Sequence, residues 1–299
     1  MAAHDLRFSG ACDCHVHIVG ALSQFPQVAS RSYTAGVASL DSLRALAKPM
    51  GVSRFVIVQP SFYGTDNACL LEALSALGGD GRGVAVLDPM VVTADLLDQY
   101  SRRGVRGLRV NLYSKSLAGR SGSTEDLLRL AIESVPRAGW HVEIIASAST
   151  LLSAARVIEN SRVRVVIDHY GLPENFTAQS SEGRKLLDLV RLPHAWVKLS
   201  APYRVVDDPL ATKPPMDWLI ALTHAAPDRC VWGSDWPHTP LSRDQQGAAF
   251  AVPYRNIGYS KLFGDFVQAL GDTTVNERIL VTNPARLYGF RSGSSENSH

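Results

Sequence analysis

The residues in this chain that could do chemistry gather in short histidine and aspartate motifs. The first motif is Asp13-Cys14-His15-Val16-His17. Side chains two residues apart on a strand point to the same face, so His15 and His17 project together. Two neighbouring imidazoles can bind a metal or polarise a carbonyl oxygen. We therefore predict that this pair belongs to a functional site, with two satisfied core histidines as the alternative.

Two further motifs contain His169 and Asp235. His169 follows an apolar, β-branched run, so it stands at the predicted end of a strand, where packing or capping is the alternative role. Asp235 ends another apolar run in the segment WGSDWPH, and a carboxylate there is costly unless it is paired or functional. It could take a proton from water, bind a metal or cap the next helix. His238 could orient the same water or the substrate, or face solvent.

Several cations and hydroxyl groups could bind a substrate. Arg109 alternates with apolar residues in GLRVNL, Lys115 follows in the next loop, and Arg204 lies just after a later apolar run. Converging cations indicate an anionic substrate, such as one with carboxylate groups, whereas a solvated surface charge is the alternative, above all for Lys115. Ser61 and Tyr63 could donate to a substrate oxygen or be ordinary turn residues.

Two charges stand inside predicted strands. Glu143 lies among apolar residues in HVEII, and Lys198 lies in AWVKLS. A carboxylate in such a place needs a partner, which a metal or a cation inside the fold could supply. A structural ion pair is the alternative for Glu143.

These residues fall at the ends of short apolar runs that alternate with helix-like segments, one of them over Leu151–Glu159. The eight runs are Ala11–Ile18, Arg54–Gln59, Gly83–Leu87, Gly107–Leu112, His141–Ile145, Val163–His169, Ala195–Ser200 and Arg229–Ser234. This alternation predicts a single α/β domain, a (β/α)8 barrel over residues 1–290, followed by a polar, disordered tail over residues 291–299. A doubly wound open sheet is the alternative, but no G-x-G-x-x-G follows a strand.

Composition excludes several classes of protein. The 299 residues are 45% hydrophobic and 19% charged, and the net charge is +2, so neither a disordered chain nor a binder of nucleic acid or acidic membrane is indicated. No stretch approaches the roughly 18 apolar residues of a membrane span. Four cysteines are too few for a disulfide framework, and the first residues lack an apolar signal segment. We expect a cytoplasmic protein.

With these motifs in hand, the chain resembles the amidohydrolase superfamily, and within it the amidohydrolase-2 group of pyrone-dicarboxylate, muconolactone and sulfomuconolactone hydrolases. The matching segments are DCHVHI at Asp13–Ile18, FVIVQPSFYGTDN at Phe55–Asn67, GVRGLRVNL at Gly104–Leu112, VVIDHYG at Val165–Gly171, WVKLSAPYR at Trp196–Arg204, VWGSDWPH at Val231–His238 and ILVTNPARLYG at Ile279–Gly289. The resemblance implies a barrel hydrolase that opens the ring of a small anionic lactone by water attack on the ester carbonyl.

The resemblance also implies roles for individual residues. Asp235 would be the base that activates water, and the carbonyl would be polarised by His15, His17 and His169. Arg109 and Arg204 would bind substrate carboxylates. Where the pyrone-dicarboxylate enzymes have a second arginine and a tyrosine, this chain has Lys115 and Ile145, so a related muconolactone, including a sulfonated one, is a candidate substrate beside the pyrone dicarboxylate.

The sequence is compatible with catalysis by a bound metal and with catalysis without one. One Zn²⁺ could be held by a set of five residues, as in metal-using relatives, and metal-free catalysis is the alternative. The candidate ligands are His15, His17, Glu143, His169 and Asp235. Two other functions are considered, a metal-dependent decarboxylase or hydratase of an aromatic-derived acid and a non-catalytic small-molecule binder. The expected partner is the lactone, and a homo-oligomer is compatible with the sequence.

Overall fold

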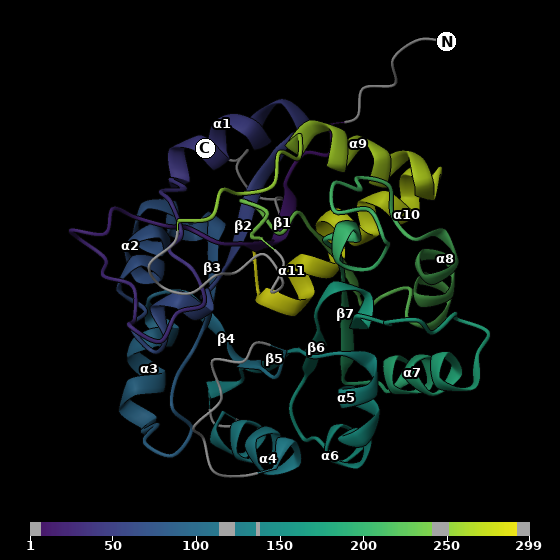
Figure 1. Cartoon of the computed structure of the whole chain (residues 1–299), viewed down its shortest axis with the longest axis horizontal. Coiled ribbons are helices and arrows are strands. Elements are labelled where there is room, and N and C mark those ends of the chain that lie inside the picture. Colours follow the sequence, from purple (N-terminus) through teal and green to yellow (C-terminus); the bar gives the residue numbers. More distant parts are fainter. Residues whose placement is uncertain (1–6, 114–122, 136–137, 241–250, 292–299) are drawn as a thin grey trace, which may run out of the picture.

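The computed structural model describes residues 7–113, 123–135, 138–240 and 251–291. Its centre is an eight-stranded sheet, parallel throughout and ordered β1 to β8, which curls into an almost closed barrel (Figure 1). The strands are β1 Ala11–Val16, β2 Val52–Val58, β3 Gly81–Ala85, β4 Val105–Asn111, β5 His141–Ile145, β6 Val165–Ile167, β7 Ala195–Ser200 and β8 Cys230–Gly233. The predicted (β/α)8 barrel is confirmed, and each predicted run overlaps one strand, although β2, β3 and β4 each begin two residues before the predicted run.

Helices form the outer ring (Figure 1). They are α1 Leu40–Ala47, α2 Ala68–Leu77, α3 Ala94–Arg102, α4 Thr124–Ser134, α5 Ala148–Ser153, α6 Ala155–Glu159, α7 Ser181–Arg191, α8 Met216–Ala225, α9 Tyr259–Leu270, α10 Thr273–Glu277 and α11 Asn283–Tyr288. Serine or threonine hydroxyls cap the starts of several of them, as Ser39 does for α1 and Ser180 for α7. One predicted helix, over 151–159, is instead broken at Ala154 into α5 and α6.

Apolar side chains fill both sides of the barrel wall. Every residue of β1 and of β7 is buried, as expected for parallel strands covered by helices on the outside. The inward-facing cluster consists largely of small or β-branched side chains, including Val56, Val84 and Val231. The wall is therefore a packed core that holds the strands in place.

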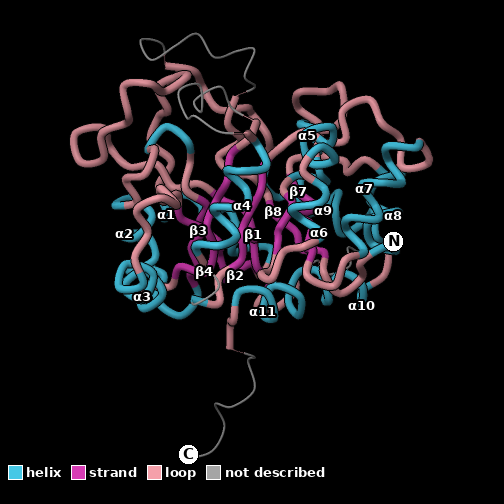
Figure 2. Tube along the Cα trace, turned by 90° about the horizontal axis from the view of Figure 1, so that it is seen from below, coloured by secondary structure: helices cyan, strands magenta, loops and turns pink. Residues whose placement is uncertain are grey.

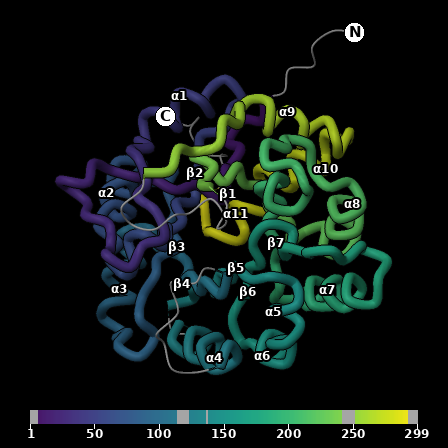
Figure 3. Tube along the Cα trace, in the orientation of Figure 1, coloured from purple at the N-terminus to yellow at the C-terminus, as the bar shows by residue number. Residues whose placement is uncertain are grey.

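The bottom of the barrel is closed by α11, which appears in the middle of the ring in the view down the barrel (Figure 3) and beyond one end of the strands in the side view (Figure 2). Its Tyr288 and the following Phe290 join the inner apolar cluster. Arg82 at the start of β3 donates to the carbonyl oxygens of Tyr288 at 3.1 Å and Gly289 at 2.8 Å. Its guanidinium also lies 4.5 Å from the centre of the Phe290 ring.

The first and last strands meet through irregular contacts, which we call the β1–β8 seam and define by residues 13–17 and 233–236. The amide of Asp235 donates to the carbonyl of His15, and the amide of His17 donates to the carbonyl of Trp236, both at 2.8 Å. Asp13 accepts from the amide of Ser234 at 2.8 Å. The seam thus joins the two segments that carry the predicted histidines and aspartate.

Some predicted features lie outside the described residues. These are Lys115 and the tail over 291–299 apart from Arg291. Within the described part, none of the helices combines the length and apolar character that crossing a bilayer requires.

Candidate active site

The four residues predicted to be catalytic lie together at the carboxyl ends of β1, β6 and β8. The ring of His15 has its centre 5.0 Å from that of His17 and 4.8 Å from that of His169. Oδ1 of Asp235 lies 3.6 Å from Nε2 of His15 and 3.3 Å from Nε2 of His17. All four side chains are buried, so their interactions are little screened by water.

Three residues at the site have left-handed backbone conformations. His169, Asp235 and His238 have φ angles of 51°, 60° and 68°, in the left-handed region that residues other than glycine rarely adopt. Such conformations cost free energy and tend to occur at functional sites. Each of the three residues follows the end of a strand, so the chain turns sharply there and directs the side chain across the mouth of the barrel.

The two carboxylate oxygens of Asp235 have different surroundings. Oδ2 accepts hydrogen bonds from the hydroxyl of Tyr203 and from Nε of Arg204, both at 2.7 Å. Oδ1 is buried and has no hydrogen-bond partner among the described residues. Burial raises the pKa of Asp235, but the opposing effect of Arg204, followed by that of His169, holds this pKa well below its usual range. Asp235 is therefore an ionised carboxylate with one oxygen held and one available.

Tyr203 is a site residue that sequence reasoning missed. Its hydroxyl also lies 3.2 Å from Nδ1 of His238, which is buried beside it. The only signal in the sequence is its position between Pro202 and Arg204, directly after β7, in the short helical turn Pro202–Arg204. That position alone does not distinguish a functional tyrosine from a packing residue.

Hydrogen bonds at the far ring nitrogens orient two of the histidines. Nδ1 of His17 lies 2.8 Å from the carbonyl oxygen of Val58, which can only accept, so Nδ1 carries a proton, and in the neutral ring Nε2 presents a lone pair. Nδ1 of His169 lies 2.8 Å from the hydroxyl of Ser200. Burial lowers the pKa of His169 to about 4, so this ring is neutral near pH 7.

A cluster of charges lies beneath His15. Nζ of Lys198 is 2.5 Å from Oε2 of Glu143, 3.7 Å from Oδ1 of Asp168 and 3.2 Å from Nδ1 of His15. Lys198 and Glu143 are both fully buried. Of the partners expected for Glu143, the structure provides the cation inside the barrel.

The predicted substrate-binding residues take different positions. Arg109 donates to the carbonyl oxygen of Gln59 at 2.8 Å and lies on the wall of a mouth cavity that also includes Ser61 and Arg204. Arg204 is occupied by Asp235 and by the hydroxyl of Thr239 at 2.7 Å. Tyr63 is buried, and its hydroxyl accepts a hydrogen bond from the amide of Gly20 at 3.1 Å, so it is directed elsewhere.

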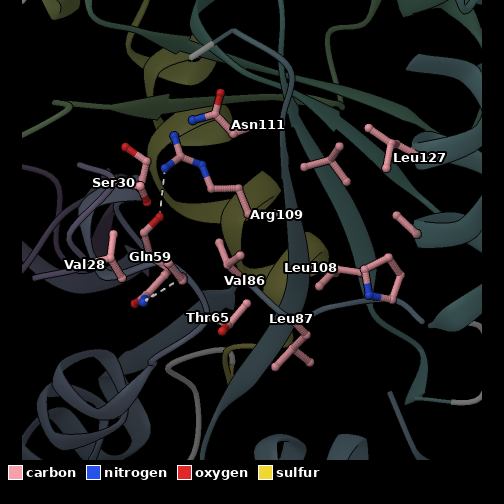
Figure 4. A pocket seen from close by; sticks show the side chains of 15 residues that line it. Val28, Ser30, Gln59, Thr65, Val86, Leu87, Leu108, Arg109, Asn111 and Leu127 are labelled. Carbon is pink, nitrogen blue, oxygen red and sulfur yellow. Dashed lines mark hydrogen bonds between the residues drawn. The ribbon is translucent and has the colours of Figure 1, made fainter. Parts of the chain in front are cut away.

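The mouth cavity continues into a side pocket that Figure 4 shows from close by. The two share Ser61, Arg109 and Asn111. In Figure 4 Arg109 and Asn111 stand on one side of this pocket, whereas Leu87, Leu108 and Leu127 line the other. A bound molecule could therefore place polar groups against Arg109 and apolar atoms further in.

Two groups of residues in the described chain could hold a metal ion. In one group, His15, His17 and Asp235, and in the other, His15, Asp168 and His169, the potential ligand atoms lie within 4.8 Å of one another. The bare Nε2 of His17 and the unpartnered Oδ1 of Asp235 fit a metal as they stand. Nε2 of His15 fits only if its proton moves to Nδ1, where Lys198 already donates. Glu143 belongs to neither group.

Comparisons with known proteins point to one family. The amidohydrolase family model matches residues 12–290. A 4-sulfomuconolactone hydrolase of Rhizobium radiobacter is 29% identical, covering 94% of this chain and 90% of that protein. A 2-pyrone-4,6-dicarboxylate hydrolase of Comamonas testosteroni is 30% identical with the same two coverages. A solved structure from Agrobacterium tumefaciens superimposes with a TM-score of 0.78 at 22% identity, covering 95% of this chain and 97% of that one.

Proposed function

The chain belongs to the amidohydrolase family, and from this premise we propose that it hydrolyses a small anionic lactone. The observation that carries the proposal is the open Oδ1 of Asp235, which is buried, ionised and faces the imidazoles of His15 and His17. Two relatives, named as hydrolases of 4-sulfomuconolactone and of 2-pyrone-4,6-dicarboxylate, support the substrate class.

The proposed reaction is attack of water on the ring ester. Oδ1 of Asp235 takes one proton from the water as its oxygen bonds to the ring carbonyl carbon. Negative charge then develops on the carbonyl oxygen, where donors from the histidine cluster stabilise it. The ring carbon–oxygen bond breaks, and the departing alkoxide takes the proton from Asp235. The product is an open-chain hydroxy acid, and the enzyme returns to its starting state.

Cations would hold the acid groups of the substrate. Arg109 and Arg204 both reach the mouth cavity, and their guanidinium groups suit carboxylate or sulfonate oxygens. Fixing these groups places the ring carbonyl close to the activated water. Ser61 on the same wall could donate to a further substrate oxygen. Lys115 remains a candidate that lies outside the described residues.

A divalent metal such as zinc belongs to the proposal as an option for the His15, His17 and Asp235 group. When bound there it would supply Lewis-acid polarisation of the carbonyl or of water. His15 fits the metal only after a proton shift, and the reaction above uses the protein's own groups alone. Elemental analysis of the purified protein, together with activity before and after chelation, separates the zinc option from the metal-free one.

The test is a screen of five- and six-membered lactones that carry carboxylate or sulfonate groups, followed with a pH indicator. We expect proton release at rates well above the spontaneous reaction, and no release from neutral lactones of the same ring size. Release of CO2 from an aromatic-derived acid in place of lactone opening would overturn the proposal in favour of a decarboxylase. Saturable binding of the lactones without turnover would replace it with a binding protein.

A further inference from the structure

The ammonium group of Lys198 is a buried charge beneath the site. It is fully buried and approaches Glu143, Asp168 and His15. Buried lysines are rare unless they are paired, and the Glu143 ion pair at 2.5 Å meets that need. The contact with His15 is not required for charge balance, and it affects the proton of the imidazole.

An ammonium group can only donate hydrogen bonds. The bond between Nζ of Lys198 and Nδ1 of His15, at 3.2 Å, therefore requires a lone pair on Nδ1. Two carboxylate oxygens lie further from the same nitrogen, Oδ1 of Asp168 at 3.4 Å and Oε1 of Glu143 at 3.8 Å, so the ammonium group is its nearest partner. In a neutral imidazole the proton then resides on Nε2. Burial lowers the pKa of His15 well below its usual value, in keeping with a neutral ring.

The neutral forms of the two histidines consequently face the site as different tautomers. His17 donates from Nδ1 to the carbonyl of Val58 and presents a lone pair. His15 presents an N–H, directed to the space beside Oδ1 of Asp235, 3.6 Å away. Nε2 of His15 has no hydrogen-bond partner in the described part of the chain, so this donor remains available to a bound molecule.

We propose that Lys198 is a positioning residue that holds His15 as an Nε2–H donor toward the carbonyl oxygen of the substrate. The inference rests on the proposed function and gives one of its histidines a definite task. Lys198 touches no substrate and acts through His15. The same bond opposes a metal at His15, because a metal needs the lone pair of Nε2 and would force two donors, Nδ1–H and the ammonium group, to face each other.

The test replaces Lys198 together with its ion-pair partner. The double variant Lys198→Met, Glu143→Gln keeps the volume and removes both members of the ion pair, while Asp168 keeps the guanidinium of Arg109 at 3.8 Å. Glu143→Gln alone is the matched control, because it keeps the bond from Lys198 to His15 and leaves Asp168, 3.7 Å away, as the carboxylate beside the ammonium group. Lys185→Met, at an exposed lysine of α7, controls for loss of a lysine elsewhere.

The decisive readout is the position of the proton on His15 in the full chain after chelator treatment. It is measured by NMR with ¹⁵N-labelled histidine, and His15→Gln identifies the signals. We expect Nε2–H in the wild type and in both controls. In the double variant Nδ1 faces the carboxylate of Asp168, so we expect a shift to Nδ1–H. Wild-type protein with its proton on Nδ1, or a double variant with an unchanged proton position, would overturn the inference.

Two further measurements follow the same change. We expect kcat on an active lactone to fall by roughly 10- to 100-fold in the double variant, the usual range for groups behind a site, with a smaller change in KM. Zinc affinity, measured by competition with a chromophoric chelator, should rise. Neither the proton position nor zinc binding depends on finding a lactone, so failure of the proposed function and failure of this inference are separate results. The wild-type spectrum alone decides the inference if the double variant does not fold.

Discussion

Asp235 divides its two carboxylate oxygens between two tasks. Oδ2 is held by Tyr203 and Arg204 at 2.7 Å each, which fixes the orientation of the group. Oδ1 is left without a partner among the described residues. The same positive neighbour that orients the carboxylate also keeps its pKa well below the usual range, against the effect of burial. An acceptor that is ionised, oriented and unoccupied is what water activation needs.

We expect Asp235→Asn to lower kcat for the lactone by roughly 10²- to 10⁴-fold, the usual contribution of a general base. An amide cannot take the proton, but it keeps the shape of the side chain, so substrate binding measured by calorimetry should persist. Asp217→Asn, at an exposed position of α8, is the matched control. Near-normal turnover in the Asp235 variant would contradict the mechanism.

At the scale of elements, the β1–β8 seam sets the distance between the histidine pair and Asp235. Gly233 allows the two strands to approach, since a Cβ at this position would lie 2.6 Å from Cβ of His15. Asp13 holds the other side by accepting from the amide of Ser234 and from the hydroxyl of Tyr259 at 3.0 Å. Small changes at the seam should therefore displace catalytic groups without touching them chemically.

Gly233→Ala tests this directly. The added methyl group forces the seam apart, so we expect the free energy of unfolding to fall by about 1–3 kcal/mol, the usual cost of overpacking. We also expect kcat to fall at temperatures where the variant remains folded. Gly36→Ala is the control, because no atom lies within 4 Å of a Cβ built there. Urea denaturation and steady-state kinetics measure both effects, and equal behaviour of the two variants would refute the role of the seam.

Asp13, at the seam, makes the free energy of unfolding depend on pH. Burial raises its pKa from 3.8 to about 6, so the folded state binds a proton more tightly than the unfolded state. The associated stability is fully present below pH 3.8 and is lost as the pH rises through about 6. Asp13→Asn cannot ionise, so its free energy of unfolding relative to the wild type should rise by about 3 kcal/mol between pH 3.5 and 7. A constant difference in the free energy of unfolding between the two proteins across this range, measured by urea denaturation, would contradict the assignment.

At the scale of the whole molecule, contacts that stabilise the barrel and the residues of the candidate site lie at opposite ends of the strands. The closing helix α11 and the contacts of Arg82 lie at the bottom, whereas the site lies at the carboxyl ends of the strands (Figure 2). In barrels of this kind the mouth carries the reaction and the base carries the packing.

Phe290→Ala should therefore change stability alone. The ring is 6% exposed and packs against Arg82 and Tyr288. We expect a loss of about 3–5 kcal/mol in the free energy of unfolding, the usual result of removing a buried phenylalanine. The kcat of the folded variant should match the wild type. Ile220→Ala, at a side chain 49% exposed, is the control. A fall in kcat at full folding would show that the two ends are coupled.

Sequence reasoning predicted the barrel because buried parallel strands leave a clear pattern of apolar runs. It also placed His15, His17, His169 and Asp235 at strand ends, where the structure brings them together. The partners of these residues could not be predicted. Which hydroxyl reaches Asp235, and which way the hydroxyl of Tyr63 points, depend on packing between segments far apart in the chain.

The ends of helices and local backbone conformations could not be predicted from the sequence either. The break at Ala154 between α5 and α6 has no glycine or proline to mark it. The left-handed conformations of His169 and Asp235 occur in residue types that seldom adopt them, so no local preference reveals them. Both features are imposed by the surrounding structure.

The β1–β8 seam has a consequence for how this protein becomes active. His15 and Asp235 are more than two hundred positions apart in the chain, yet their backbones are joined by a single hydrogen bond of 2.8 Å. A growing chain on the ribosome has no complete site until its eighth strand docks against its first. Recovery of lactone turnover after dilution from denaturant would thus time the final closure of the barrel, where fluorescence of the five tryptophans would average over earlier events.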